Sequence, residues 1–144
     1  MKLTTFSDYT LRVLMFLAIN RDRLVTVPEI AGAYGISENH LVKVVHRLAR
    51  SGTVETVRGK GGGLRLACEP GEIRLGQVVR ASEGSAPIVE CFSEEANACR
   101  IAPACRLASI LDRAFEALFA TLDQYTLADL VRAPRKLEAL LAAG

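Results

Sequence analysis

The apolar positions in the first third of the chain repeat with the spacing of three α-helices. In residues 6–19 apolar side chains lie nearly all round, so we expect a helix buried on several sides. Thr26 and Glu29 have the spacing of a capping box that begins a second, short helix, and Gly35 can take the left-handed conformation that ends it. Ser37 is expected to cap a third helix. The apolar face of this third helix consists of Leu41, Val44, Val45 and Leu48.

Strand-like alternation replaces the helical period after residue 52. Residues 54–57 and 64–67 predict two short strands, and the glycine-rich stretch between them predicts a β-hairpin. The second and third helices form a helix-turn-helix candidate, and a hairpin directly after such a pair is a wing. Residues 73–82 predict another short helix.

A long helix is expected over residues 104–124, because an unbroken apolar stripe runs along it at helical spacing. Thr126 is expected to cap a short turn after it, and Pro134 to begin a tail helix. The predicted fold class is therefore mainly α with a small β-hairpin: a winged helix-turn-helix plus a long C-terminal helix.

The polar face of the third helix carries side chains suited to DNA. Asn and Arg can bond bidentately to base edges, and Lys and Arg neutralise phosphates. A solvated charged face is the ordinary alternative, but the capped turn before the helix and the wing after it favour DNA binding. A recognition helix reads bases mainly from its N-terminal end. The candidates are Ser37, Asn39, His40 and Lys43 for bases or phosphates, and Arg47 and Arg50 for phosphates.

The predicted wing adds two basic residues, Arg58 and Lys60, among four glycines. Small residues let a backbone approach DNA closely, and arginine suits a narrow minor groove. A glycine-rich loop can also cradle a nucleotide phosphate, but here it joins two strands and does not open a helix. His40 and His46 are six residues apart and do not share a helix face, so they are not expected to bind a metal together.

The distribution of charge agrees with a DNA-binding front half. Residues 1–80 contain 12 Lys and Arg against 7 Asp and Glu, whereas residues 81–144 contain 6 against 9. The chain shows neither an apolar run long enough to span a bilayer nor a signal-peptide pattern. We therefore expect a cytoplasmic protein with no membrane partner.

Cys91, Cys99 and Cys105 crowd into fifteen residues. Such a cluster in an intracellular protein points to metal binding or redox chemistry, and the spacing is not that of common structural zinc sites. Soft thiolates suit an iron–sulfur cluster or zinc, and a redox thiol switch is a third reading. Cys105 lies at the start of the long helix, where the helix dipole favours a thiolate. Cys68 is expected to be a small buried apolar residue and not a ligand.

Five motifs lie in order along the chain: LTTFSDY at 3–9, ISENHLVK at 36–43, VRGKGGG at 57–63, PACRL at 103–107 and YTLADL at 125–130. With these motifs, the sequence resembles the NsrR-type nitric-oxide-sensing repressors of the winged-helix iron–sulfur regulator family, which also includes the IscR and RirA types. The resemblance covers nearly the whole chain.

The resemblance implies a homodimer that crosses its long helices and binds a palindromic DNA operator while its cluster is intact. It implies release of the operator when nitric oxide nitrosylates the cluster, and it implies a [4Fe–4S] cluster held by the three clustered cysteines. In some members an aspartate early in the first helix of the partner subunit is the fourth ligand, and Asp8 has that place here. A carboxylate favoured by the helix dipole is the alternative role for Asp8.

Two alternatives stay open at this stage. RirA-type iron sensors share the cysteine spacing, so iron or cluster supply is a second candidate signal. A zinc or thiol enzyme is a third reading, weakened because both histidines lie on the expected recognition helix. IscR-type members have a histidine ligand shortly after the third cysteine, where this chain has Arg106-Leu107-Ala108. We divide the chain into a DNA-binding region (1–80), a cysteine-rich cluster loop (81–106) and a dimerisation helix with its tail (107–144).

Overall fold

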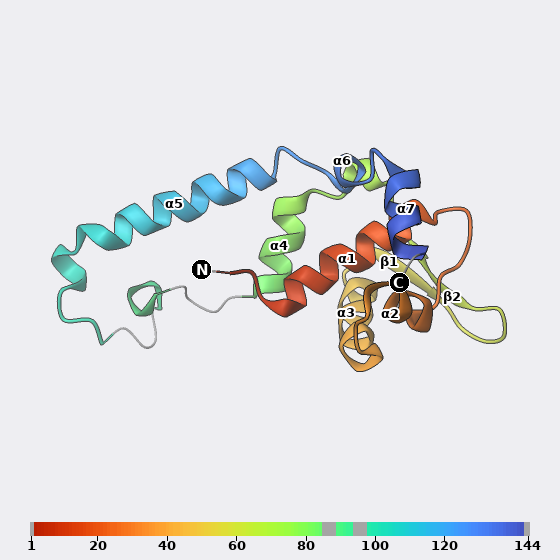
Figure 1. Ribbon diagram of the computed structural model, residues 1–144. Helices are drawn as coiled ribbons and strands as arrows, with labels where there is room; N and C mark the ends of the chain where they lie inside the picture. Colours follow the sequence, from red (N-terminus) through yellow and green to blue (C-terminus); the bar gives the residue numbers. More distant parts are fainter. Residues whose placement is uncertain (1, 85–88, 94–97, 143–144) are drawn as a thin grey trace.

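The computed structural model describes residues 2–84, 89–93 and 98–142. It confirms the mainly helical fold with one antiparallel hairpin. Figure 1 shows a compact bundle that carries the hairpin, and a long helix that projects away from it. The elements are α1 (Thr5–Ile19), α2 (Val27–Tyr34), α3 (Glu38–Arg50), β1 (Val54–Val57), β2 (Gly63–Leu66), η1 (Pro70–Glu72), α4 (Leu75–Glu83), η2 (Glu90–Phe92), η3 (Ala102–Ala104), α5 (Arg106–Leu122), α6 (Leu127–Leu130) and α7 (Pro134–Ala142).

Helix α1 lies at the centre of the bundle. It contacts α3, α4, α6 and β2, and this agrees with its expected burial on several sides. Its side chains Leu14 and Leu17 are almost fully buried, as are Ile30 of α2 and Leu41 of α3. Leu127 of α6 is fully buried in the same core, so the chain returns to the bundle after α5.

The helix ends confirm most of the expected caps. Thr26 and Glu29 form the capping box of α2, and Gly35 ends that helix with a φ of 64°. The hydrogen bond that the Glu29 carboxylate accepts from the Thr26 amide lowers the pKa of that carboxyl. The expectation for Ser37 was only partly right: it is the N-cap residue of α3, but its side chain makes no cap hydrogen bond.

The expected helix over 73–82 begins later than the pattern predicted. Residues Pro70–Glu72 form a short 3₁₀ helix, and α4 begins at Leu75. The intervening backbone is extended because it pairs with the segment after α5. The Leu127 amide donates to the Ile73 carbonyl at 2.9 Å, and the Leu75 amide donates to the Tyr125 carbonyl at 3.0 Å. A pairing across about fifty residues leaves no local signal in the sequence.

Helix α5 is the element that projects in Figure 1, and it meets the bundle through α4. In α5, every residue of which is described, no side chain is buried. Asp123, which ends α5, pairs with Arg80 of α4 at 2.8 Å, and Arg80 also lies 4.5 Å from the centre of the Phe119 ring. These contacts of Arg80 with Asp123 and Phe119 set the direction of α5 relative to α2 and α3.

The ion pair between Arg80 and Asp123 depends on Gly76 in α4. A Cβ at Gly76 would overlap the Asp123 carboxylate and lie 3.1 Å from its backbone nitrogen. We therefore expect Gly76→Ala to lower the free energy of unfolding by about 1–3 kcal/mol, because the carboxylate must leave Arg80. Gly32→Ala is the matched control, since nothing lies within 4 Å of its Cβ and alanine favours the helix by about 1 kcal/mol. Urea denaturation of both variants checks this, and equal stability would contradict it.

Candidate DNA interface and cysteine segment

The exposed face of α3 is made by residues at one helical repeat. Asn39, Lys43, His46 and Arg50 are all exposed, and their spacing places them along one side of the helix. This side lies opposite the buried Leu41, Val44, Val45 and Leu48. The face therefore presents an amide, an imidazole and two cationic groups in a row. Ser37 is exposed at the N-terminal end of the same helix.

Two of the predicted DNA contacts, His40 and Arg47, lie on the flank of α3 and contact aromatic side chains of α1. The His40 ring is 6.0 Å from the Tyr9 ring, and the Arg47 guanidinium lies 5.6 Å from the centre of the Phe6 ring. A cation over an aromatic face is attracted by the ring, so Phe6 holds Arg47 beside the polar face. The sequence predicted DNA contacts for both residues and gave no sign of their aromatic support.

Between the first turn of α1 and the second half of α3 lies a cationic hollow of about 550 Å³. Its chemistry is that of an anion site, since most of its side chains are basic. His46 lines this hollow as well, and it was not among the DNA contacts predicted from the sequence. The full lining is Phe6, Lys43, His46, Arg47, Arg50 and Ser51.

The wing confirms the predicted hairpin. Strands β1 and β2 pair from Val54↔Leu66 to Val57↔Gly63, and Val25 adds a bridge to Leu64. Arg58 and Lys60 are exposed at its tip. Gly62 is required there because a Cβ would overlap the Val57 carbonyl oxygen.

The segment that contains the three clustered cysteines leads into the end of α5 that lies farther from the bundle (Figure 1). Cys91 lies within η2, and Cys105 is the N-cap residue of α5. The Ala102 amide donates to the Cys99 carbonyl at 3.2 Å, so η3 links Cys99 to Cys105. All three side chains are half-buried, and no disulfide joins any of the four cysteines.

The donor set has the chemistry of an iron–sulfur site, although the described residues do not assemble one. Three half-buried thiols within one segment supply soft ligands of the kind that such clusters need. Within residues 2–84, 89–93 and 98–142, no three His, Cys, Asp or Glu side chains are placed to hold a metal ion. Asp8 lies in the first turn of α1, where its carboxylate pairs with Arg12 of its own chain at 2.9 Å.

Cys68 differs from its expected role as a buried apolar residue. It is half-buried and lines a groove between α3 and α4. Burial and the neighbouring carboxylate of Glu72 raise the pKa of the Cys68 thiol. A thiol with a raised pKa is mainly protonated at neutral pH, which makes it a poor nucleophile.

A helix-turn-helix with an exposed amide and basic face, followed directly by a basic hairpin, defines a winged-helix DNA-binding regulator. The sequence profile of the Rrf2 family, described as "Iron-dependent Transcriptional regulator", matches residues 3–133. The chain belongs to this family and is a transcriptional regulator. Because the relatives are transcriptional regulators, we reject the alternative interpretation of the chain as a zinc or thiol enzyme.

Two curated relatives have the same name, HTH-type transcriptional regulator NsrR. The protein of Bacillus subtilis (strain 168) is 51% identical over 133 residues, which are 92% of this chain and 91% of that protein. The protein of Shouchella clausii (strain KSM-K16) is 46% identical over 142 residues, which are 98% of this chain and 95% of that protein.

Solved structures of related regulators have the same fold. T. potens IscR is similar with a TM-score of 0.73 and 29% identity, over 92% of this chain and 87% of that one. CymR, the global cysteine regulator of B. subtilis, is similar with a TM-score of 0.71 and 29% identity, over 90% of this chain and 95% of that one. Within the described residues, no helix has both the length and the apolar character to cross a membrane.

Proposed function

We propose that this chain is a nitric-oxide-responsive transcriptional repressor that binds a palindromic operator as a homodimer. Cys91, Cys99 and Cys105 would hold an iron–sulfur cluster of the [4Fe–4S] type, and nitric oxide would release the protein from DNA. The motifs shared with NsrR-type repressors support this, as do the relatives that have the NsrR name.

One observation carries the proposal: no residue in the apolar stripe of α5 is buried in the single chain, and the cysteine segment leads directly into that helix. Leu107 and Ile110 are 59% and 56% exposed, which is unusual for large apolar residues on an amphipathic helix. A second copy of α5 would cover the stripe in an isologous dimer. The stripe consists of Leu107, Ile110, Leu111, Ala114, Phe115, Leu118, Phe119 and Leu122.

The segment that contains Cys91, Cys99 and Cys105 would transmit the signal to α5 through its own folding. When bound, a cluster supplies iron that nitric oxide attacks. Ligation by the three thiolates would hold Cys91, Cys99 and Cys105 together just before α5, because ligation energy is also folding energy for the residues that ligate. When the thiolates are released, that order is lost at the end of the dimer helix. A winged-helix dimer must hold its recognition helices one helical turn of DNA apart, about 34–36 Å, or a multiple of it.

Two roles are open to Asp8: ligand to the cluster of the partner subunit, or ion-pair partner of Arg12 in its own chain. It would be the fourth ligand, given to the cysteine segment of the partner subunit, but in its own chain it pairs with Arg12. To ligate, the carboxylate must leave that pair, which costs little because both side chains are over 40% exposed. Resonance Raman and visible spectra of the wild type beside Asp8→Ala test this role, and identical spectra would exclude it.

Anaerobic purification followed by titration with nitric oxide tests the function. We expect iron and sulfide in the protein, visible absorbance, and tight binding to the operator of the native promoter. Nitric oxide should remove both the absorbance and the binding within a few equivalents. Retention of both signals through the titration would overturn the proposal. Loss of binding under a mild iron chelator, with little response to nitric oxide, would favour the alternative signal, iron or cluster supply.

Two single substitutions on α3 should separate base reading from phosphate binding. We expect Asn39→Ala to lower operator affinity by about 1–3 kcal/mol and to leave binding to random DNA unchanged. Arg50→Ala should weaken binding to both DNAs and reduce the slope of log K against log salt by about 1. Fluorescence anisotropy at several salt concentrations measures both effects. Identical behaviour of the two variants would contradict these separate roles.

A further inference from the structure

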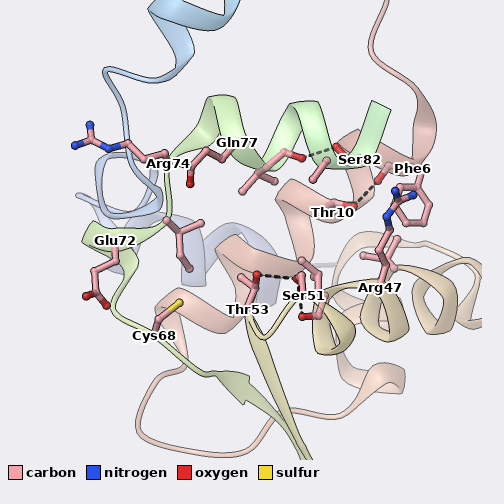
Figure 2. Close-up of a pocket in the computed structure, with 15 residues that line it drawn as sticks. Phe6, Thr10, Arg47, Ser51, Thr53, Cys68, Glu72, Arg74, Gln77 and Ser82 are labelled. Atoms are coloured by element: carbon pink, nitrogen blue, oxygen red, sulfur yellow. Dashed lines mark hydrogen bonds between the residues drawn. The ribbon is translucent and has the colours of Figure 1, made fainter. Parts of the chain in front are cut away.

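A groove between α3 and α4 has the size of a small-molecule site, and the function above does not use it. Its volume is about 390 Å³, within the range of about 300–1,000 Å³ that is usual for ligand sites. Figure 2 shows it between the ribbons of α3 and α4, with α1 behind it. A molecule bound there would touch the inner side of the recognition helix.

The wall of the groove is apolar and its two ends differ in chemistry. Val44 and Leu48 of α3 face Val78 of α4 across it. In Figure 2 the Gln77 amide and the Cys68 thiol lie toward one end. Gln77 is exposed and its side chain makes no hydrogen bond to any described residue, so its amide is available to a ligand.

The opposite end holds a cation without a carboxylate partner. Among the described residues, no carboxylate pairs with Arg47, whose guanidinium lies over the Phe6 ring. The other charged groups of the lining are engaged elsewhere. Arg74 donates to the Asp123 carbonyl at 2.9 Å, and Glu72 accepts from the Glu69 amide at 3.0 Å. The charge that complements this groove is therefore negative and belongs beside Arg47.

We propose that the groove binds a small apolar acid, with its apolar part between α3 and α4 and its carboxylate on Arg47. The inference rests on the proposed function in one respect: α3 must be the helix that binds DNA. Guanidinium and carboxylate form a strong charge-assisted pair, and the apolar walls bury the rest of the molecule.

The ligand would weaken binding to the operator. Arg47, Phe6 and Ser51 line both the groove and the cationic hollow on the DNA side. An acid that pairs with Arg47 in the groove takes that guanidinium away from a DNA phosphate. By thermodynamic linkage, DNA must then weaken binding of the acid by the same factor. A small apolar acid bound in the groove therefore acts as an inducer, because it weakens the binding of the protein to its operator.

Fluorescence of anilinonaphthalene sulfonate, an anion with apolar rings, provides the binding assay, and the chain contains no tryptophan to interfere. We expect saturable binding of one molecule per chain to the full-length protein. Decanoate should displace it, whereas decanol, which has the same apolar chain without the charge, should be about tenfold weaker. Equal displacement by the two would overturn the role given to Arg47.

A blocking variant locates the site. Ala81 is exposed on α4 and lines the groove, so Ala81→Phe should fill the space and weaken binding by about tenfold or more. Ala120→Phe is the matched control, because Ala120 is exposed on α5 away from the groove. Ile110→Asp removes an exposed apolar side chain from α5, the other apolar surface to which the probe could bind. If Ala81→Phe leaves binding unchanged, or Ile110→Asp alone abolishes it, the site is elsewhere and the proposal is wrong.

Operator binding with and without decanoate tests the coupling. We expect decanoate to lower the operator affinity of the wild type about tenfold, and to have no effect on Ala81→Phe. Decanoate bound in the groove without any change in operator affinity would overturn the inducer role. The proposed function fails separately, if the protein without decanoate does not bind its operator or does not respond to nitric oxide.

Discussion

Replacing Cys105 by serine is expected to abolish iron binding and the response to nitric oxide while the winged helix stays folded. Serine is a poor ligand for cluster iron, and the substitution leaves only two of the three proposed thiolate ligands. The substitution should not harm α5, because Cys105 is its N-cap residue and serine is a preferred N-cap. The measurement is iron and sulfide per chain in protein purified anaerobically, with circular dichroism to check the fold.

Cys68→Ser is the matched control for this experiment. It makes the same chemical change in a half-buried cysteine that lies in the groove beside α4, outside the cysteine segment. We expect it to keep the iron and sulfide content of the wild type and its response to nitric oxide. Full iron content in Cys105→Ser would contradict the ligand role, and loss of iron in both variants would point to a general effect of cysteine removal.

Ile110→Asp is expected to convert the proposed dimer into monomers and to weaken operator binding by about 10²–10⁴-fold, because the second half-site then binds independently. Ile110 is 56% exposed in the single chain, so an aspartate there does not disturb the core of the bundle. In the dimer it would bury an unpaired carboxylate on each copy, at a cost of about 3–5 kcal/mol apiece. Analytical ultracentrifugation and operator binding at fixed salt concentration measure the two effects.

Ala120→Asp tests whether the effect belongs to the apolar stripe. Ala120 is exposed on the same helix but lies outside the stripe. We expect this variant to remain dimeric and to bind the operator like the wild type. A dimer formed by Ile110→Asp would place the subunit interface on another surface, and monomers formed by both variants would show that any charge on α5 is disruptive.

Features that depend on neighbouring residues were predictable from the sequence. The capping box of Thr26 and Glu29 and the left-handed Gly35 follow from spacings of a few residues, and the structure has both. The hairpin follows from the alternation on either side of a glycine-rich loop. Each of these features is stabilised mainly by contacts within one turn of helix or one strand pair, so the local pattern is sufficient.

Features that join distant segments were not predictable. The late start of α4 depends on hydrogen bonds from Leu75 and Leu127 that cross to segments about fifty residues away. The placement of Arg47 over Phe6 requires the packing of α1 against α3. The groove beside α4 exists because three helices and a loop leave space between them, and no periodicity records that space.

The sequence by itself determined the class of this protein: the order of helices, the wing, the basic face of α3 and the three cysteines all follow from residue type and spacing. Only the tertiary structure decided which of those residues act together. It divided the predicted DNA contacts between an exposed row and a flank held by Phe6 and Tyr9. It also tied the direction of α5 to the pair of Arg80 and Asp123. The physical reason is that periodicity orients a side chain about its own helix, whereas packing between helices decides what that side chain meets.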